Sequence, residues 1–146
     1  KIEIGKGRII KEGKKIALLN FGARLTECLS ARENLIKKGI TVTIVDARFA
    51  KPLDENLIWQ IATDHEAIIT IEEGSIGGFG SHVGHFLSGK NLLDSNLKYR
   101  SMILPDRFID HDKPNLMYKF AGLDSSSIES KVLDTLNSKV IIKKTN

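Results

Sequence analysis

The segment from Ala67 to Val83 constrains the fold more than any other part of the sequence. Its first residues, Ala67–Ile71, are apolar or β-branched and indicate a strand buried on both faces. Glu72 and Glu73 follow, and four glycines then occur within seven residues before an apolar helical pattern begins. This order predicts a strand, an acidic tip, a glycine turn and a helix. In open α/β sheets, the carboxyl ends of strands meet ligands or partner surfaces, and glycine there permits close backbone approach.

Strand-like and helix-like segments alternate along most of the chain. Apolar runs predict strands at residues 16–20, 42–46, 67–72 and 98–104, and amphipathic runs predict helices at residues 26–38, 55–63, 80–87, 115–120 and 125–136, with a loop at 92–96. Asp54 is the expected N-cap of the second helix, and Ser125 or Ser126 that of the last. The alternation predicts an α/β fold with a three-layer, mostly parallel, doubly wound sheet.

The length predicts one domain with short terminal segments. A chain of 146 residues can bury a core but is too short for two comparable domains. We expect a linker and a short edge strand in residues 1–15, the domain in residues 16–138, and a tail in residues 139–146. The alternative for the tail is a final strand at Val140–Ile142, because that run is β-branched. Since the first residue is Lys1 rather than Met, we interpret the chain as part of a longer polypeptide.

The net charge of +4 comes from the two ends of the chain. Residues 1–15 hold six basic and two acidic residues, residues 139–146 hold three lysines, and the stretch between them has 13 basic and 16 acidic residues. A nucleic-acid-binding domain needs basic residues on one face, with aromatic side chains or a reading helix, and neither is visible. No apolar run is long enough to span a bilayer, and no signal-peptide pattern opens the chain. We therefore expect neither a nucleic acid nor a membrane as partner.

The glycine turn lacks the spacing of a dinucleotide-binding loop. That fingerprint needs three glycines, as Gly-x-Gly-x-x-Gly, after the first strand. Here the first strand is followed by Asn20-Phe21-Gly22-Ala23-Arg24, which has one glycine, and the later Gly78-Phe79-Gly80 continues without a third. The two glutamates would also face a pyrophosphate unfavourably, and no Gly-Lys-Ser/Thr loop occurs. The pattern disfavours NAD or FAD as a cofactor.

The residues at the turn offer only weak candidates for chemistry. His82 and His85 are three residues apart and, with Glu72 or Glu73, could ligate a metal, but we favour two partly exposed helix histidines. The two adjacent glutamates point to opposite faces of a strand, which makes them a poor acid–base pair. One of them is instead expected to accept hydrogen bonds from backbone amides of the turn.

Other polar or nucleophilic side chains are expected to have structural roles. His65 is expected to cap a helix end or to be solvated, and Asp110-His111-Asp112 is a polar loop in which an Asp–His contact is possible. No serine is placed to complete a triad. Cys28, the single cysteine, lies among apolar helix residues, so a small core residue is favoured over a catalytic thiol. We predict no catalytic, cofactor-binding or metal-binding residue in this chain.

Taken together, several stretches are more specific than any one residue. They resemble, in order and spacing, the carboxyl-terminal domain of the 1-deoxy-D-xylulose 5-phosphate synthase family. Two motifs resemble those of plant-type members in particular, namely Glu-Glu-Gly-Ser-Ile-Gly-Gly-Phe-Gly-Ser-His and Pro-Asp-Arg-Phe-Ile-Asp-His. The resemblance covers about residues 5–137, with Asp112 standing where glycine is expected and nothing matching residues 139–146. The stretches that carry it are Gly5–Gly7, Asp46–Asp54, Glu72–Val83, Leu104–His111 and Gly122–Asp124.

The resemblance implies a transketolase C-terminal-domain-like fold and a part in a thiamine-diphosphate enzyme. The complete enzyme of that family condenses pyruvate with D-glyceraldehyde 3-phosphate, releases carbon dioxide and begins the synthesis of isoprenoid and thiamine precursors. Its thiamine diphosphate and Mg²⁺ are held by two preceding domains, and their motifs do not occur here. This domain would then be non-catalytic and would support interdomain packing and a homodimer. A plant-type member implies a plastid (chloroplast stroma) location; otherwise the cytoplasm is expected.

Two alternatives remain open at this point. The first is the matching domain of another transketolase-like enzyme, such as a 2-oxo-acid dehydrogenase component. The second is a stand-alone nucleotide-binding or anion-binding α/β module that uses the helix start near Gly80.

Overall fold

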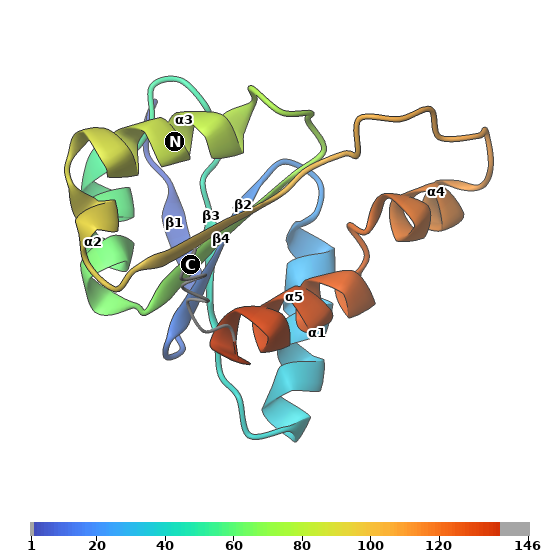
Figure 1. Ribbon diagram of the computed structural model, residues 1–146, viewed down its shortest axis with the longest axis horizontal. Helices are drawn as coiled ribbons and strands as arrows, with labels where there is room; N and C mark the ends of the chain where they lie inside the picture. The colour runs from blue at the N-terminus through green and yellow to red at the C-terminus, as the bar shows by residue number, and fades with distance from the viewer. Residues whose placement is uncertain (1, 138–146) are drawn as a thin grey trace, which may run out of the picture.

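A single mixed sheet organises the molecule. The computed structural model describes residues 2–137. Five strands lie in the order β1-β3-β2-β4-β5, with β1 antiparallel to β3 and the other neighbours parallel (Figure 1). The strands are β1 (Arg8–Lys11), β2 (Ile16–Phe21), β3 (Thr43–Asp46), β4 (Ala67–Glu72) and β5 (Lys98–Met102). The expected α/β fold with a mostly parallel, doubly wound sheet is therefore confirmed.

Helices cover both faces of the sheet and make the three predicted layers. α1 (Leu25–Lys37) and α5 (Ser125–Asn137) pack on one face, and α2 (Glu55–Asp64) and α3 (Phe79–Gly89) on the other. The strand side chains alternate between the two cores: Ile16 and Leu18 face α1 and α5, whereas Ala17 and Leu19 face α2 and α3. A continuous apolar run is the pattern that a strand with two buried faces requires.

Three predictions about the helices and their ends can be compared with the structure. Asp54 is the N-cap of α2, because its Oδ1 accepts from Leu57 N at 3.2 Å. The prediction of Ser125 or Ser126 as cap of α5 was wrong: Asp124 Oδ1 accepts from Ser127 N at 3.0 Å, which places the cap one residue earlier. The loop expected at 92–96 contains a short 3₁₀ helix, η1 (Leu92–Asp94), which is too short to show a helical period.

The ends of the chain bear on the predicted domain limits. The expected edge strand is present as β1, and the segment before it is tied to the start of α2, since Gly7 N donates to Asp54 Oδ2 at 3.1 Å. The division into residues 1–15, 16–138 and 139–146 stays a prediction, and the tail with its possible strand at Val140–Ile142 lies outside the described residues. Across residues 2–137, no helix has the length and apolar character needed to cross a membrane.

Candidate functional site

Glu72 occupies the centre of the glycine turn. It is the last residue of β4, and only 3% of its surface is exposed. Its Oε1 accepts from Phe79 N at 3.0 Å, and its Oε2 accepts from Gly80 N. These are amides of the first turn of α3, where the helix dipole favours a negative charge. The carboxylate therefore takes the place that an anionic ligand would take at a helix start, and the expected bonding of one glutamate to turn amides is confirmed.

The glycines of the turn leave room for this carboxylate. A Cβ on Gly74 or on Gly78 would collide with Glu72 Oε1, and one on Gly80 would press on Glu72 Oε2 and on the hydroxyls of two strand residues. A Cβ on Gly77, by contrast, would meet no atom within 4 Å. The backbone of Gly77 has a φ of +93°, which residues other than glycine rarely adopt. The turn thus needs glycine for two different reasons: space at three positions and backbone conformation at one.

Tyr99 on β5 fastens the first turn of α3 from the other side. Its hydroxyl donates to Gly80 O and lies 3.2 Å from Thr70 Oγ1. Burial raises the pKa of the Tyr99 phenol, so the hydroxyl keeps its proton for these contacts at neutral pH. Sequence reasoning missed this residue because 19 positions separate it from Gly80, and no local pattern links the two.

Glu73 points to the opposite face, as expected for a neighbour on a strand. Its Oε1 lies 2.8 Å from Nε of Arg24, whose guanidinium stacks at 3.5 Å over the ring of Tyr118. A hydrogen bond with Glu73 raises the pKa of the Tyr118 hydroxyl. Tyr118 belongs to α4 (Pro114–Ala121), so this cluster ties the turn to the start of α1 and to a distant helix. The sequence pattern singled out neither Arg24 nor Tyr118, because only the tertiary fold brings them together.

Both carboxylates of the acidic tip are thus engaged in contacts that hold the fold. Glu72 bonds two helix amides, and Glu73 pairs with a cation at the start of another helix. They lie on opposite faces and do not form an acid–base pair that shares one substrate. This arrangement ties the end of β4 to the starts of α3 and α1.

The three histidines named at or before the turn lie on helices: His65 at the end of α2, and His82 and His85 on α3. His65 caps α2: its Nδ1 lies 2.9 Å from Ile61 O, and its Nε2 lies 2.7 Å from Thr43 Oγ1. His82 is half-buried and His85 is exposed on α3. Within residues 2–137, no group of three or more His, Cys, Asp or Glu side chains is placed to hold a metal ion.

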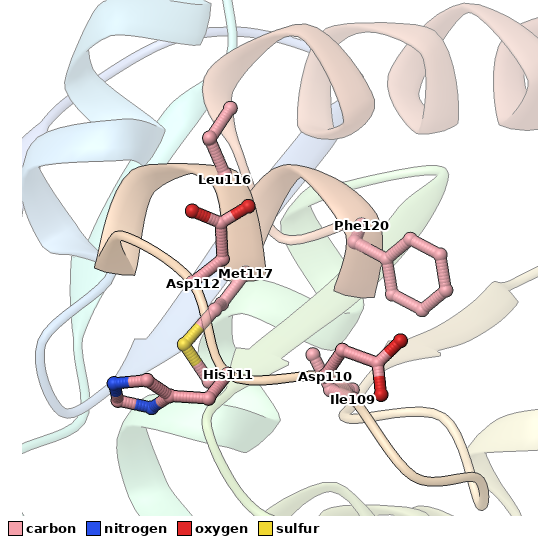
Figure 2. A pocket seen from close by; sticks show the side chains of 7 residues that line it. All are labelled: Ile109, Asp110, His111, Asp112, Leu116, Met117 and Phe120. Atoms are coloured by element: carbon pink, nitrogen blue, oxygen red, sulfur yellow. The ribbon is translucent and has the colours of Figure 1, made fainter.

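The Asp110-His111-Asp112 loop lines a hollow of about 290 Å³ beside α4. Figure 2 shows the ring of His111 and the carboxylate of Asp110 pointing in opposite directions, and Asp112 Oδ1 accepts instead from Lys113 N at 2.6 Å. The possible Asp–His contact is therefore not seen with either aspartate. The other lining residues are mostly apolar and come from the same loop and from α4, namely Ile109, Leu116, Met117 and Phe120. This hollow is apolar on one side and has no paired acid and base.

Cys28 is a core residue, as predicted. It is fully buried on α1, and its Sγ lies 4.0 Å from Oδ1 of the buried Asn20. Burial raises the pKa of the thiol to about 12, so the thiol stays protonated and shielded.

We expect Cys28 in the native chain to react with a thiol reagent at pH 8 at least about 100-fold more slowly than in the unfolded chain, because the thiolate is the nucleophile. Folding raises the pKa of the Cys28 thiol, so the contribution of the protonated thiol to the free energy of unfolding is fully present below the ordinary pKa of about 8.5. That contribution is lost as the pH rises from this value toward the pKa of the thiol in the folded chain. Labelling with and without denaturant measures the ratio, and rapid labelling of the native chain would contradict a buried thiol.

Comparisons with known proteins agree with this architecture. The family model described as the transketolase C-terminal domain matches residues 5–128. A split-gene transketolase, solved as an inactive β4 tetramer, superposes with a TM-score of 0.85 at 28% sequence identity, over 96% of this chain and 45% of that one. A transketolase from Campylobacter jejuni has a TM-score of 0.65 at 16% identity, over 89% of this chain and 18% of that one, which concerns the fold alone. This chain therefore spans less than half the length of each of these two transketolases. Because the family model covers residues 5–128, the chain belongs to the transketolase C-terminal domain family.

Proposed function

We propose that this chain is the carboxyl-terminal, non-catalytic domain of a 1-deoxy-D-xylulose 5-phosphate synthase. The complete enzyme would condense pyruvate with D-glyceraldehyde 3-phosphate and release carbon dioxide. The observation that carries the non-catalytic role is the commitment of both tip carboxylates, Glu72 and Glu73, to contacts within the domain. The choice of this synthase within the family is supported by the sequence stretches around Glu72–Val83 and Leu104–His111.

The residues of this chain do not fit thiamine diphosphate and Mg²⁺. A diphosphate needs free backbone amides or cationic side chains, and the amides at the start of α3 already bond Glu72. No cluster of potential metal ligands lies among the described residues. In this proposal the preceding domains hold the cofactor, and the present domain supports their packing and the homodimer. The plastid location stays a prediction.

The same geometry bears on the alternatives. An anion-binding module would use the helix start near Gly80, but the carboxylate of Glu72 fills that position. The domain of another transketolase-like enzyme, including a 2-oxo-acid dehydrogenase component, remains compatible with the fold. The 28% identity to a split-gene transketolase is the observation that favours this second candidate.

An assay of the complete polypeptide distinguishes these functions. We expect it to form 1-deoxy-D-xylulose 5-phosphate and carbon dioxide from pyruvate and D-glyceraldehyde 3-phosphate, and we expect the 146-residue chain alone to give no heat of binding with thiamine diphosphate and Mg²⁺. Two-carbon transfer between sugar phosphates without carbon dioxide release would favour a transketolase instead. Micromolar cofactor binding by the chain alone would overturn the assignment of the cofactor to the preceding domains.

A further inference from the structure

Exposed apolar side chains concentrate at the carboxyl edge of the sheet. Eight large hydrophobic residues are exposed among residues 2–137, and two of them, Ile36 and Trp59, lie on the outer helices. The other six lie in segments next to the carboxyl ends of the strands: Ile2, Ile4, Ile76, Phe108, Leu116 and Phe120. Isolated apolar residues on a surface are ordinary, whereas several on one short segment, as with Phe108, Leu116 and Phe120, are typical of an interaction surface.

Three of these residues belong to one projecting element, residues 103–121, which we call the arm. The arm comprises the loop after β5 and the helix α4, and Figure 1 shows α4 standing away from the sheet. α4 buries none of its residues, and Phe108 is fully exposed. Tyr118 and Ala121 pack one side of α4 against the core, whereas Leu116 and Phe120 remain about half exposed on the helix.

The arm is held in place although it packs little. Leu104 N donates to Gly74 O at 2.9 Å, which joins the base of the arm to the glycine turn. At the other end, the ring of Tyr118 lies on the guanidinium of Arg24, which is paired with Glu73. These contacts hold the two ends of the arm, its base at the glycine turn and α4 at Arg24, while the loop between them has few backbone partners.

The course of the chain indicates what covers the arm. The family model is that of a C-terminal domain, and the split-gene transketolase chain is more than twice as long as the part this chain matches. In such a chain the other domains precede this one. The segment before β1 enters at the same edge, where Lys6 and Gly7 contact Asp54 and where Ile2 and Ile4 are exposed. A linker at this edge delivers the preceding domain to the side on which the apolar residues gather.

We propose that the arm docks, through Phe108, Leu116 and Phe120 together with Ile76, onto the preceding domain of the same polypeptide. This rests on the proposed function only in that a domain must precede this one. Charged residues on the same segment, Asp106, Arg107 and Lys113, are also exposed, and the Arg107 guanidinium lies 4.3 Å from the centroid of the Phe120 ring. Polar groups beside apolar ones are usual in interfaces between domains.

Hydrogen exchange of the loop at residues 105–113 tests the docking. In the 146-residue chain these amides have few backbone partners (Arg107 N bonds to Pro105 O) and should exchange rapidly. In the complete polypeptide we expect their exchange to slow by about tenfold or more. The double variant F108S/L116S should abolish this protection, whereas the matched control I36S/W59S, which changes the two exposed residues away from this edge, should retain it.

The outcomes separate the possible occupants. Protection that does not depend on polypeptide concentration supports docking within one chain. Protection that appears only with rising concentration, together with a doubled mass in light scattering, would show that a second copy covers the arm and would overturn the proposal, as would the absence of protection. F108S/L116S should leave the melting temperature of the 146-residue chain within about 3 °C, because Phe108 is fully exposed and Leu116 is half exposed. The control I36S/W59S removes side chains that are 39% and 45% exposed, so its exchange is compared at a temperature at which that variant is folded. A polypeptide that shows protection but lacks synthase activity would reject the proposed function and keep the docking.

Discussion

Gly80→Val is expected to lower the stability of the domain by about 3 kcal/mol, the upper part of the range for overpacking a filled site. A Cβ at this position would meet Ser101 Oγ, Thr70 Oγ1 and Glu72 Oε2. Thr70 and Glu72 are buried and hydrogen-bonded, so they cannot move aside without losing those bonds. For a domain of this size, the melting temperature should fall by about 9 °C.

Gly89→Val is the matched control for this substitution. Gly89 ends the same helix, α3, and a Cβ there meets nothing within 4 Å. We expect its melting temperature to stay within about 2 °C of the parent. In the complete polypeptide, Gly80→Val should reduce the folded fraction, and under the proposed function it should leave the turnover of each folded molecule unchanged. Normal stability with lost turnover would point instead to a direct catalytic role for the turn.

Glu72→Ala is expected to cost about 2–3 kcal/mol, because two buried helix amides lose their acceptor. Glu73→Ala is the neighbouring comparison: 32% of the Glu73 side chain and 14% of the Arg24 side chain are accessible, so the ion pair is only partly screened by solvent. We expect Glu73→Ala to cost about 1–2 kcal/mol, less than Glu72→Ala, because Glu73 pairs with one cation whereas Glu72 satisfies two buried amides. Thermal unfolding of the two variants side by side should therefore show a clearly larger loss for position 72.

A small anion should restore part of the loss in Glu72→Ala. The substitution would leave a carboxylate-sized space at the start of α3, and helix amino termini attract anions. We expect formate to raise the melting temperature of this variant more than that of the parent or of Glu73→Ala. Equal responses of all three proteins would show that the carboxylate is not what holds the turn.

The sequence predicted the sheet better than the site. Continuous apolar runs such as Ile16–Asn20 identified strands buried on two faces because they are shorter than an ordinary buried helix and are followed by a glycine turn. The cap of α5 was misplaced because serine and aspartate are both good caps, and the choice depends on where the first helical turn starts. The 3₁₀ helix at Leu92–Asp94 spans three residues, which is less than any recognisable period.

The contacts that define the site depend on the tertiary fold. The glycine spacing predicted that a glutamate would bond to turn amides, but the choice of Glu72 follows from the face that α3 covers, which the sequence alone does not reveal. Close backbone approach was expected at the glycine turn as a whole. The structure shows close approach at Gly78 and Gly80, with φ of −81° at Gly78, and places the positive φ at Gly77. Arg24 and Tyr118 are in contact although 94 positions separate them in the sequence, so no local sequence pattern could predict this pair.

The burial of one carboxylate among glycines also has an evolutionary consequence. Because the side chain of Glu72 fills the space beside Gly74 and Gly78, a mutation that adds a side chain at either glycine is disfavoured for as long as the acid is present. Loss of the acid, in turn, leaves two helix amides without an acceptor until a compensating residue appears. Each single step is thus deleterious on the background of the others. Positions 72, 74 and 78 are expected to be inherited as one unit and to be replaced together in lineages that remodel this turn.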